Sequence, residues 1–269
     1  MPELPEVENI CHSMRLSLLG TTIINSEVRN GNLRFPISHE IYTINYQKIL
    51  TIKRRARYII IKLSEGYLII HLGMSGSLRI LPLGKLPTKH DHIDLVISNQ
   101  KIIRYTDPRR FGYWIWSDDL DKCSHLQKLG PEPLSKEFSS SYLFNKSRYK
   151  HLAVKPWLMD NKLVAGIGNI YANESLFRAS ILPTRRALTL TLYETHQLVS
   201  AIKTVLQCAI TCGGTTLRNF TNLEGLTGNF YQRIQVYGRN GKSCNQCGTL
   251  IEHIKYRQRS TFFCIKCQK

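Results

Sequence analysis

The chain has 269 residues, 42% of them hydrophobic, so it can bury a core and form about two domains. Lysine and arginine outnumber aspartate and glutamate by 37 to 19, which gives a formal net charge of +18. This composition excludes a disordered tail or a mini-protein. The charge favours a polyanionic partner, of which nucleic acid is the first candidate.

Two features bear on where the protein works. The first residues, MPELPEVE, are acidic and contain two prolines, so they lack the basic and apolar regions of a secretory signal. The longest apolar runs, such as residues 58–61 and 68–70, are much shorter than the ~20 residues that span a bilayer. We therefore expect an intracellular protein without a membrane partner.

The first half of the chain is predicted to be one helix followed by many strands. Residues 5–19 carry apolar side chains at helical spacing, and Gly20 follows as a stop signal. From Thr21 to about Trp116, short runs rich in β-branched and aromatic residues recur about every eight to twelve residues. This spacing is typical of a β-sandwich or barrel.

The second half is predicted to be mainly helical. The stretch Gly130-Pro-Glu-Pro is the expected linker. Beyond it the sequence predicts helices at about 139–149, 155–160, 169–179 and 190–211. The segment from about residue 231 has room for one hairpin, 250–255 against 259–263, and is too small to fold on a hydrophobic core of its own.

Four cysteines in this last segment form the strongest local motif. Cys244-x2-Cys247 is followed after 16 residues by Cys264-x2-Cys267, the spacing of two thiolate pairs around one tetrahedral zinc ion. Two disulfides or an iron centre are the alternatives. Four protein ligands would leave no position for a catalytic water, so we expect one structural Zn²⁺. The hairpin then presents Lys255, Arg257 and Arg259 to a phosphate backbone, or else forms a solvated basic turn.

Other candidate ligands are expected to be ordinary structural residues. His90 and His92, in KHDHID, resemble metal ligands, but a polar strand edge is the preferred interpretation. The remaining four cysteines are scattered and are expected to be small buried thiols, namely Cys11, Cys123, Cys208 and Cys212.

Pro2 is a candidate nucleophile. Removal of the initiator Met would expose a secondary amine, and an α-amino group titrates near ~7.7–8.0, below the ~10.4 of lysine. Such an amine could attack C1′ of a nucleotide and form an iminium ion that acts as an electron sink. Glu3 and Glu6 are candidate proton-handling groups beside it. The same three residues also fit ordinary helix initiation, because proline and acidic side chains favour a first turn.

Five motifs together carry a family resemblance. MPELPEVE, HLGMSGSLR, TDPRRFG, KPWLMDNKLVAGIGNIYANE and the four-cysteine finger occur in the order found in the formamidopyrimidine-DNA glycosylase family, which the chain resembles from end to end. The resemblance implies an α+β multidomain protein. Its expected domains are an N-terminal β-sandwich with an N-terminal helix (1–130), a helix-two-turn-helix domain (131–230) and a zinc finger (231–269).

The resemblance also implies an activity and a partner. Members excise oxidised purines, 8-oxoguanine and formamidopyrimidines, from damaged double-stranded DNA, and then cleave the strand by β and δ elimination. Pro2 matches the nucleophile, Glu3 the acid that assists sugar opening, and Glu6 a second carboxylate near the site. A monomeric, cytoplasmic bacterial enzyme, associated with the nucleoid through DNA, is expected.

Further positions match DNA contacts of the family. An enzyme that extrudes a base must fill the gap, and Met74, Arg109 and Phe111 match the residues that do so. Without the resemblance, Met74 and Phe111 would be read as core residues and Arg109 as an ion-pair partner. The matching phosphate-side or DNA-binding positions are His71, Lys155, Asn169 and Arg259, with 166–169 as a helix-terminal phosphate turn.

The chain departs from the family pattern at two places. Arg57, a candidate catalytic residue, stands where the family usually has lysine. The arginine keeps the charge, so a contact with phosphate or base is expected to survive, whereas a proton-transfer role is not. The loop 224–229 lacks the usual basic, proline and aromatic residues near Leu226, Thr227 and Asn229, and it is expected to close over the extruded base.

Two other functions compete with this interpretation. The related endonuclease VIII group removes oxidised pyrimidines and typically has glycine after Pro-Glu, whereas Leu4 and the PRRF loop favour the purine branch. A catalytically inactive zinc DNA-binding protein would explain the charge and the finger. It would not need Pro2, Glu3 and Glu6.

Overall fold

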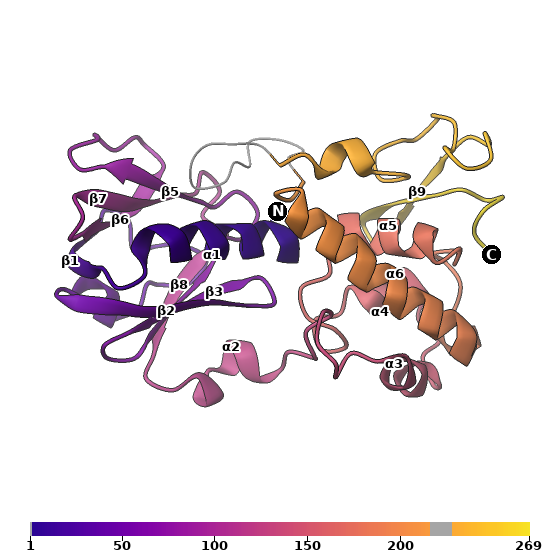
Figure 1. The fold of residues 1–269 in the computed structure, drawn as a ribbon, viewed down its shortest axis with the longest axis horizontal. Helices are drawn as coiled ribbons and strands as arrows, with labels where there is room; N and C mark the ends of the chain where they lie inside the picture. The colour runs from indigo at the N-terminus through magenta and orange to yellow at the C-terminus, as the bar shows by residue number, and fades with distance from the viewer. Residues whose placement is uncertain (1, 216–227) are drawn as a thin grey trace. The chain divides into compact units, whose positions relative to one another are not determined.

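The computed structural model describes residues 2–215 and 228–269 (Figure 1). Contacts divide the chain into two compact units, Met1–Gln127 with Cys212–Asn229 and Lys128–Thr211 with Phe230–Lys269. Three of the residues at which the sequence departs from the family pattern, Glu224, Leu226 and Thr227, lie outside the described residues.

The first unit begins with the predicted amphipathic helix, α1 (Leu4–Leu18). A proline lies in its first turn, where the missing backbone N–H costs nothing. Its apolar face, which includes Val7, Ile10 and Met14, is fully buried. The chain leaves the helix through Gly20, whose φ of 80° is a left-handed conformation that suits glycine.

Eight antiparallel strands follow, one for each of the short apolar runs in the sequence. They are β1 (Thr22–Val28), β2 (Gln47–Arg55), β3 (Tyr58–Leu63), β4 (Tyr67–His71), β5 (Ser77–Pro82), β6 (Asp91–Ile97), β7 (Lys101–Thr106) and β8 (Tyr113–Ser117). Their order is β5-β7-β6-β1-β2-β3-β4-β8. Three short helical segments were not predicted: η1 (His39–Tyr42), η2 (Leu120–Lys122) and α2 (Ser124–Gln127).

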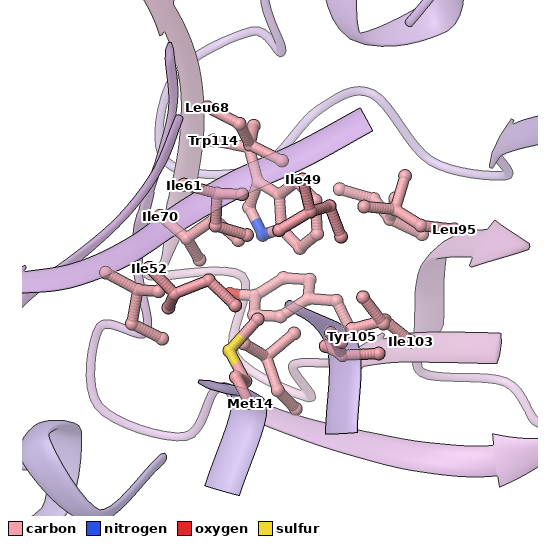
Figure 2. Close-up of a cluster of buried hydrophobic side chains, with 14 of the residues drawn as sticks. Met14, Ile49, Ile52, Ile61, Leu68, Ile70, Leu95, Ile103, Tyr105 and Trp114 are labelled. Carbon is pink, nitrogen blue, oxygen red and sulfur yellow. The ribbon is translucent and has the colours of Figure 1, made fainter. Parts of the chain in front are cut away.

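The strands form two layers around one core. β1 and β2 pair through Thr22↔Lys48 and Ile23↔Gln47, and this short junction joins the β5-β7-β6-β1 half to the β2-β3-β4-β8 half. Side chains from both halves and from α1 meet in the core, among them Leu95, Trp114 and Met14 (Figure 2). The predicted β-sandwich with an N-terminal helix is confirmed.

The second unit contains four longer helices, as predicted. They are α3 (Ser140–Ser147), α4 (Val154–Leu158), α5 (Asn169–Arg178) and α6 (Leu192–Thr211), with the short turns η3 (Ala187–Thr189) and η4 (Phe230–Arg233). Ser139 caps α3 by accepting the N–H of Tyr142 at 3.1 Å. No helix in the described part of the chain is long and apolar enough to cross a membrane.

The chain ends in a hairpin of β9 (Glu252–Tyr256) and β10 (Arg259–Phe263). Its turn places Arg257 and Gln258 at φ values of 45° and 59°. The buried apolar side chains of this segment pack against Phe177 of α5. The finger therefore shares its small core with the helices, as expected for a segment too small to have a core of its own.

Candidate functional site

The candidate nucleophile and both candidate carboxylates lie together at the start of α1. Pro2 is buried, and Glu3 and Glu6 are 3% and 2% exposed. One carboxylate oxygen of Glu6, Oε2, accepts the backbone N–H of Glu3 at 2.8 Å. The other, Oε1, accepts the N–H of Thr215 at 2.7 Å. Glu6 thus connects the first residues of the chain to a segment more than 200 positions away.

Glycines allow that segment to approach. Gly214 has a φ of 85°, and a Cβ on it would lie 3.1 Å from Glu6 Oε1. A Cβ on Gly228 would lie 2.3 Å from the carbonyl oxygen of Gly214. Gly214 and Thr215 were not predicted as site residues, although the consecutive glycines in CGGTT were an available signal.

Arg57 occupies a tight turn between β2 and β3. Arg55 pairs with Tyr58, so the turn consists of Ala56 and Arg57. Arg54 holds this turn by donating to the Ala56 carbonyl at 3.0 Å and to Glu8 of α1 at 2.8 Å. Through these contacts, the helix that carries the candidate nucleophile also supports the turn that carries Arg57.

His71, at the end of β4, is held as a neutral imidazole. Its Nδ1 accepts the N–H of Gly73 at 3.0 Å, so the ring proton resides on Nε2. Burial, and then the positive charges of Arg57 and Arg34, lower the His71 pKa to about 4. The ring stacks on Tyr113 with a centroid distance of 4.9 Å. His71 is therefore a neutral donor at physiological pH.

The three candidate gap-filling residues come together on two neighbouring loops. Met74 and Phe111 are 43% and 41% exposed, which excludes the core role that their residue types alone would favour. The guanidinium carbon of Arg109 lies 4.5 Å from the centroid of the Phe111 ring. Two apolar side chains and the guanidinium of Arg109, which can donate several hydrogen bonds, are thus exposed to solvent.

Lys155, Asn169 and Arg259 meet at the finger hairpin. Lys155 is 2% exposed, and its Nζ donates to the Ser260 carbonyl at 2.7 Å and to Thr261 Oγ1 at 2.8 Å. Asn169 Nδ2 donates to the same Ser260 carbonyl at 3.0 Å. Arg259, the residue immediately before Ser260, is exposed. The buried Lys155 side chain thus stabilises the hairpin through hydrogen bonds, whereas the Arg259 side chain is open to solvent.

Glu174 on α5 is a further anchor that the sequence analysis missed. It is 3% exposed and accepts the N–H groups of Gln235, Val236 and Tyr237 at 2.8, 3.0 and 2.8 Å. Burial raises its pKa, and these hydrogen bonds oppose that effect. The signal in the sequence was a glutamate in register with Ile170 on the buried face of a predicted helix.

The four finger cysteines are placed to bind one metal ion. Their sulfurs all lie within 4.8 Å of one another, with Cys247 and Cys264 at 3.4 Å and Cys244 and Cys267 at 3.9 Å. These separations exceed the ~2.05 Å of a disulfide. Four Zn–S bonds of ~2.3 Å in tetrahedral geometry place sulfurs roughly 3.8 Å apart, so the donor set fits zinc.

Two secondary expectations need correction. His92 is not at a polar edge: it is 4% exposed, its Nε2 lies 2.8 Å from the Asp107 carbonyl, and β6 is flanked by β7 and β1. Cys11 and Cys123 are buried as expected, but Cys208 and Cys212 are partly exposed. Across the described ranges, the four finger cysteines are the single cluster of His, Cys, Asp or Glu suited to a metal.

Comparisons with known proteins agree with this architecture. Residues 1–114 match the formamidopyrimidine-DNA glycosylase N-terminal domain, 129–221 its H2TH domain, and 241–269 the zinc finger found in FPG and IleRS. The formamidopyrimidine-DNA glycosylase of Yersinia enterocolitica is 57% identical over 268 residues, covering 100% of both chains.

Solved structures extend the comparison to three dimensions. A Lactococcus lactis FPG mutant in complex with a Fapy-dG containing DNA has a TM-score of 0.93 and 33% identity, with 100% of both chains covered. The complex between Lactococcus lactis Fpg and an abasic site containing DNA gives the same values. By sequence over its whole length and by fold, the chain belongs to the formamidopyrimidine-DNA glycosylase family.

Proposed function

We propose that this chain excises oxidised purines, 8-oxoguanine and formamidopyrimidines, from duplex DNA and then cleaves the strand as an AP lyase. The observation that carries the proposal is the buried group of Pro2, Glu3 and Glu6 at the start of α1. Once Met1 is removed, this group combines a secondary amine at Pro2 with two carboxylates. Glu3 and Glu6 also form the capping box of α1, so the distinguishing feature is the buried Pro2 beside them, which precedes the N-cap and is not needed for helix initiation.

The reaction follows from the chemistry of that amine. Once Met1 is removed, the unprotonated Pro2 nitrogen attacks C1′ and the glycosidic bond breaks; the nitrogen gives up its proton, and the departing base takes up one proton. Glu3 supplies the proton that opens the sugar ring. The resulting iminium ion withdraws electrons, so loss of a C2′ proton expels the 3′ phosphate, and a second elimination expels the 5′ phosphate. Glu6, bound by two backbone N–H groups, keeps the amine and the 214–215 segment in place.

The other residues serve recognition. Met74, Arg109 and Phe111 fill the space left by the extruded base. Phosphates accept hydrogen bonds from four side chains, namely His71 in its neutral form, Arg57, Asn169 and Arg259. Lys155 acts by supporting the hairpin.

The remaining parts of the proposal concern organisation. Zinc is structural, because four thiolates complete its coordination. The proposed domains are the β-sandwich (1–130), the helix-two-turn-helix domain (131–230) and the zinc finger (231–269). The nucleoid is the proposed place of action.

Borohydride trapping tests the catalytic proposal. A duplex with one 8-oxoguanine opposite cytosine is incubated with the native protein, with Pro2→Gly, and with a form that carries one extra residue ahead of Pro2. We expect a covalent adduct on the N-terminal peptide of the native protein. The extra residue removes the secondary amine and should abolish the adduct.

Pro5→Ala is the matched control, because Pro5 is a nearby proline in the first turn of α1 and is also buried. It should still form the adduct. Trapping on oxidised pyrimidines alone would favour the endonuclease VIII-like reaction. Tight binding without an adduct on any lesion would exclude the catalytic proposal.

A further inference from the structure

The Met74 and Phe111 loops are in direct backbone contact. We call residues 72–76, between β4 and β5, and 107–112, between β7 and β8, the wedge loops. Gly73 has a φ of 63°, and a Cβ on it would lie 2.4 Å from the Phe111 carbonyl carbon and 2.5 Å from the Gly112 nitrogen. No side chain fits there. The two loops therefore form one continuous surface, and a shift of either loop displaces the other.

One carboxylate lies at the centre of both loops. Asp107 is fully buried, with 0% exposure. Its Oδ1 accepts the Ser75 hydroxyl from one wedge loop and the N–H of Arg109, at 3.3 Å, from the other. Its Oδ2 accepts the Tyr105 hydroxyl at 2.9 Å and the Gly112 N–H at 2.8 Å. Four donors thus converge on one side chain.

The backbone of Asp107 is fixed as well. Its N–H donates to the His90 carbonyl at 3.0 Å, and its carbonyl accepts from the Arg110 N–H at 3.2 Å. His92 Nε2 lies 2.8 Å from the same carbonyl. Since the carboxylate is anchored to the β6 and β7 side of the sandwich, it transmits that rigidity to both wedge loops.

Tyr105 completes the arrangement by steric contact. A Cβ on Gly112 would lie 1.9 Å from the Tyr105 hydroxyl oxygen, and a Cβ on Gly76 would lie 2.8 Å from it. Burial raises the pKa of Tyr105, so its hydroxyl stays a donor to Asp107. One glycine from each wedge loop leaves room for this hydroxyl.

We propose that Asp107 is a positioning residue that holds Met74, Arg109 and Phe111 as one preformed wedge. The inference rests on the proposed function, in which these side chains replace an extruded base. Side chains on a backbone that is already ordered lose less conformational entropy on insertion than side chains on mobile loops. Asp107 therefore lowers the barrier to base extrusion without touching DNA.

If Asp107 has this role, its substitution should lower activity on one substrate much more than on another. Excision of 8-oxoguanine from a duplex requires a paired base to be extruded, whereas strand cleavage at a preformed abasic site does not. Asp107→Asn replaces one acceptor oxygen by an NH₂ group, which cannot accept from the donors that face it. We expect kcat/KM for 8-oxoguanine excision to fall about tenfold to a hundredfold, the size of effect that misplaced catalytic geometry produces. Cleavage at the abasic site should change less than about threefold.

Asp94→Asn is the matched control. Asp94 is also a buried carboxylate, 4% exposed, but its ion pairs are with Arg104 at 2.6 Å and Arg29 at 2.9 Å, neither of which belongs to the wedge loops. It should lose stability, measured by thermal melting, while the ratio of the two activities stays at the native value. Ser75→Ala and Tyr105→Phe each remove one donor and should shift the ratio less than Asp107→Asn, which keeps the test available if that variant does not fold.

The outcomes are distinct. A lower excision-to-cleavage ratio in Asp107→Asn and Ser75→Ala, but not in Asp94→Asn, supports the positioning role. Equal loss of both activities, or an unchanged ratio in all variants, overturns it. If the native protein itself fails to excise 8-oxoguanine, the proposed function fails instead, and the variants are not needed to show it.

Discussion

His71 illustrates how the environment of one residue sets its chemistry. Its folded-state pKa of about 4 lies below the ~6.5 of an unfolded chain. Between these values the unfolded state binds a proton and the folded state does not, so the free energy of unfolding rises with pH in this window. The stabilisation is complete above about pH 6.5 and is lost as the pH falls toward 4.

His71→Gln should therefore flatten the pH dependence of stability. The difference between the folded and unfolded pKa values of His71 corresponds to a contribution on the order of 3 kcal/mol to the free energy of unfolding. Chemical denaturation at several pH values measures it, with His253→Gln, a substitution on the exposed face of β9, as the control. An unchanged slope in His71→Gln would contradict the lowered pKa.

The affinity of the native protein for duplex DNA should likewise show no titration of His71 between about pH 5.5 and 7.5, because this whole range lies roughly one unit or more above its pKa of about 4.

The hairpin of β9 and β10 shows how an element too small to fold alone becomes ordered. Zinc ligation closes one end, Phe177 contributes to its core, and Lys155 and Asn169 bind its Ser260 carbonyl. The two hydrogen bonds to Ser260 fix the backbone next to Arg259. The position of an exposed arginine thus depends on a metal site and on two helices.

Zinc removal should consequently weaken DNA binding without altering the nucleophile. Cys264→Ser is expected to lose the single bound zinc, measured by elemental analysis, and to bind duplex about tenfold to a hundredfold more weakly, the value of a lost charged hydrogen bond. Cys208→Ser, at a partly exposed cysteine outside the cluster, is the control and should keep both. Full affinity in zinc-free Cys264→Ser would show that the hairpin does not contribute to binding.

The net charge of +18 acts at the scale of the whole molecule. Each phosphate neutralised by lysine or arginine releases counterions, so log affinity for duplex should fall linearly with log salt concentration. Arg259→Ala should make this slope about one unit shallower, because it removes the phosphate contact proposed for Arg259. Lys122→Ala is the control, since Lys122 is 85% exposed and pairs with Asp119. An equal slope for native and Arg259→Ala proteins would rule out the phosphate contact.

Much of this protein could be predicted from local sequence patterns. Short runs rich in β-branched and aromatic residues predicted all eight strands of the sandwich, helical spacing predicted α1 and the longer helices of the second unit, and the cysteine spacing predicted the metal cluster. These features depend on residues close together in the sequence, and backbone hydrogen bonding and side-chain period determine them. The roles of Pro2, Glu3 and Arg57 stay predictions.

Tertiary structure decided which distant residues share one function. Nothing local shows that Glu6 accepts the N–H of Thr215, that Asp107 joins the loops of Met74 and Phe111, or that Lys155 is buried beneath the hairpin. His92 lies inside the sheet because β1, from a distant part of the chain, pairs with β6 on the side opposite its hairpin partner β7. Such contacts require chain closure over long separations, which depends on how the elements pack together, whereas periodicity reports only on each element by itself.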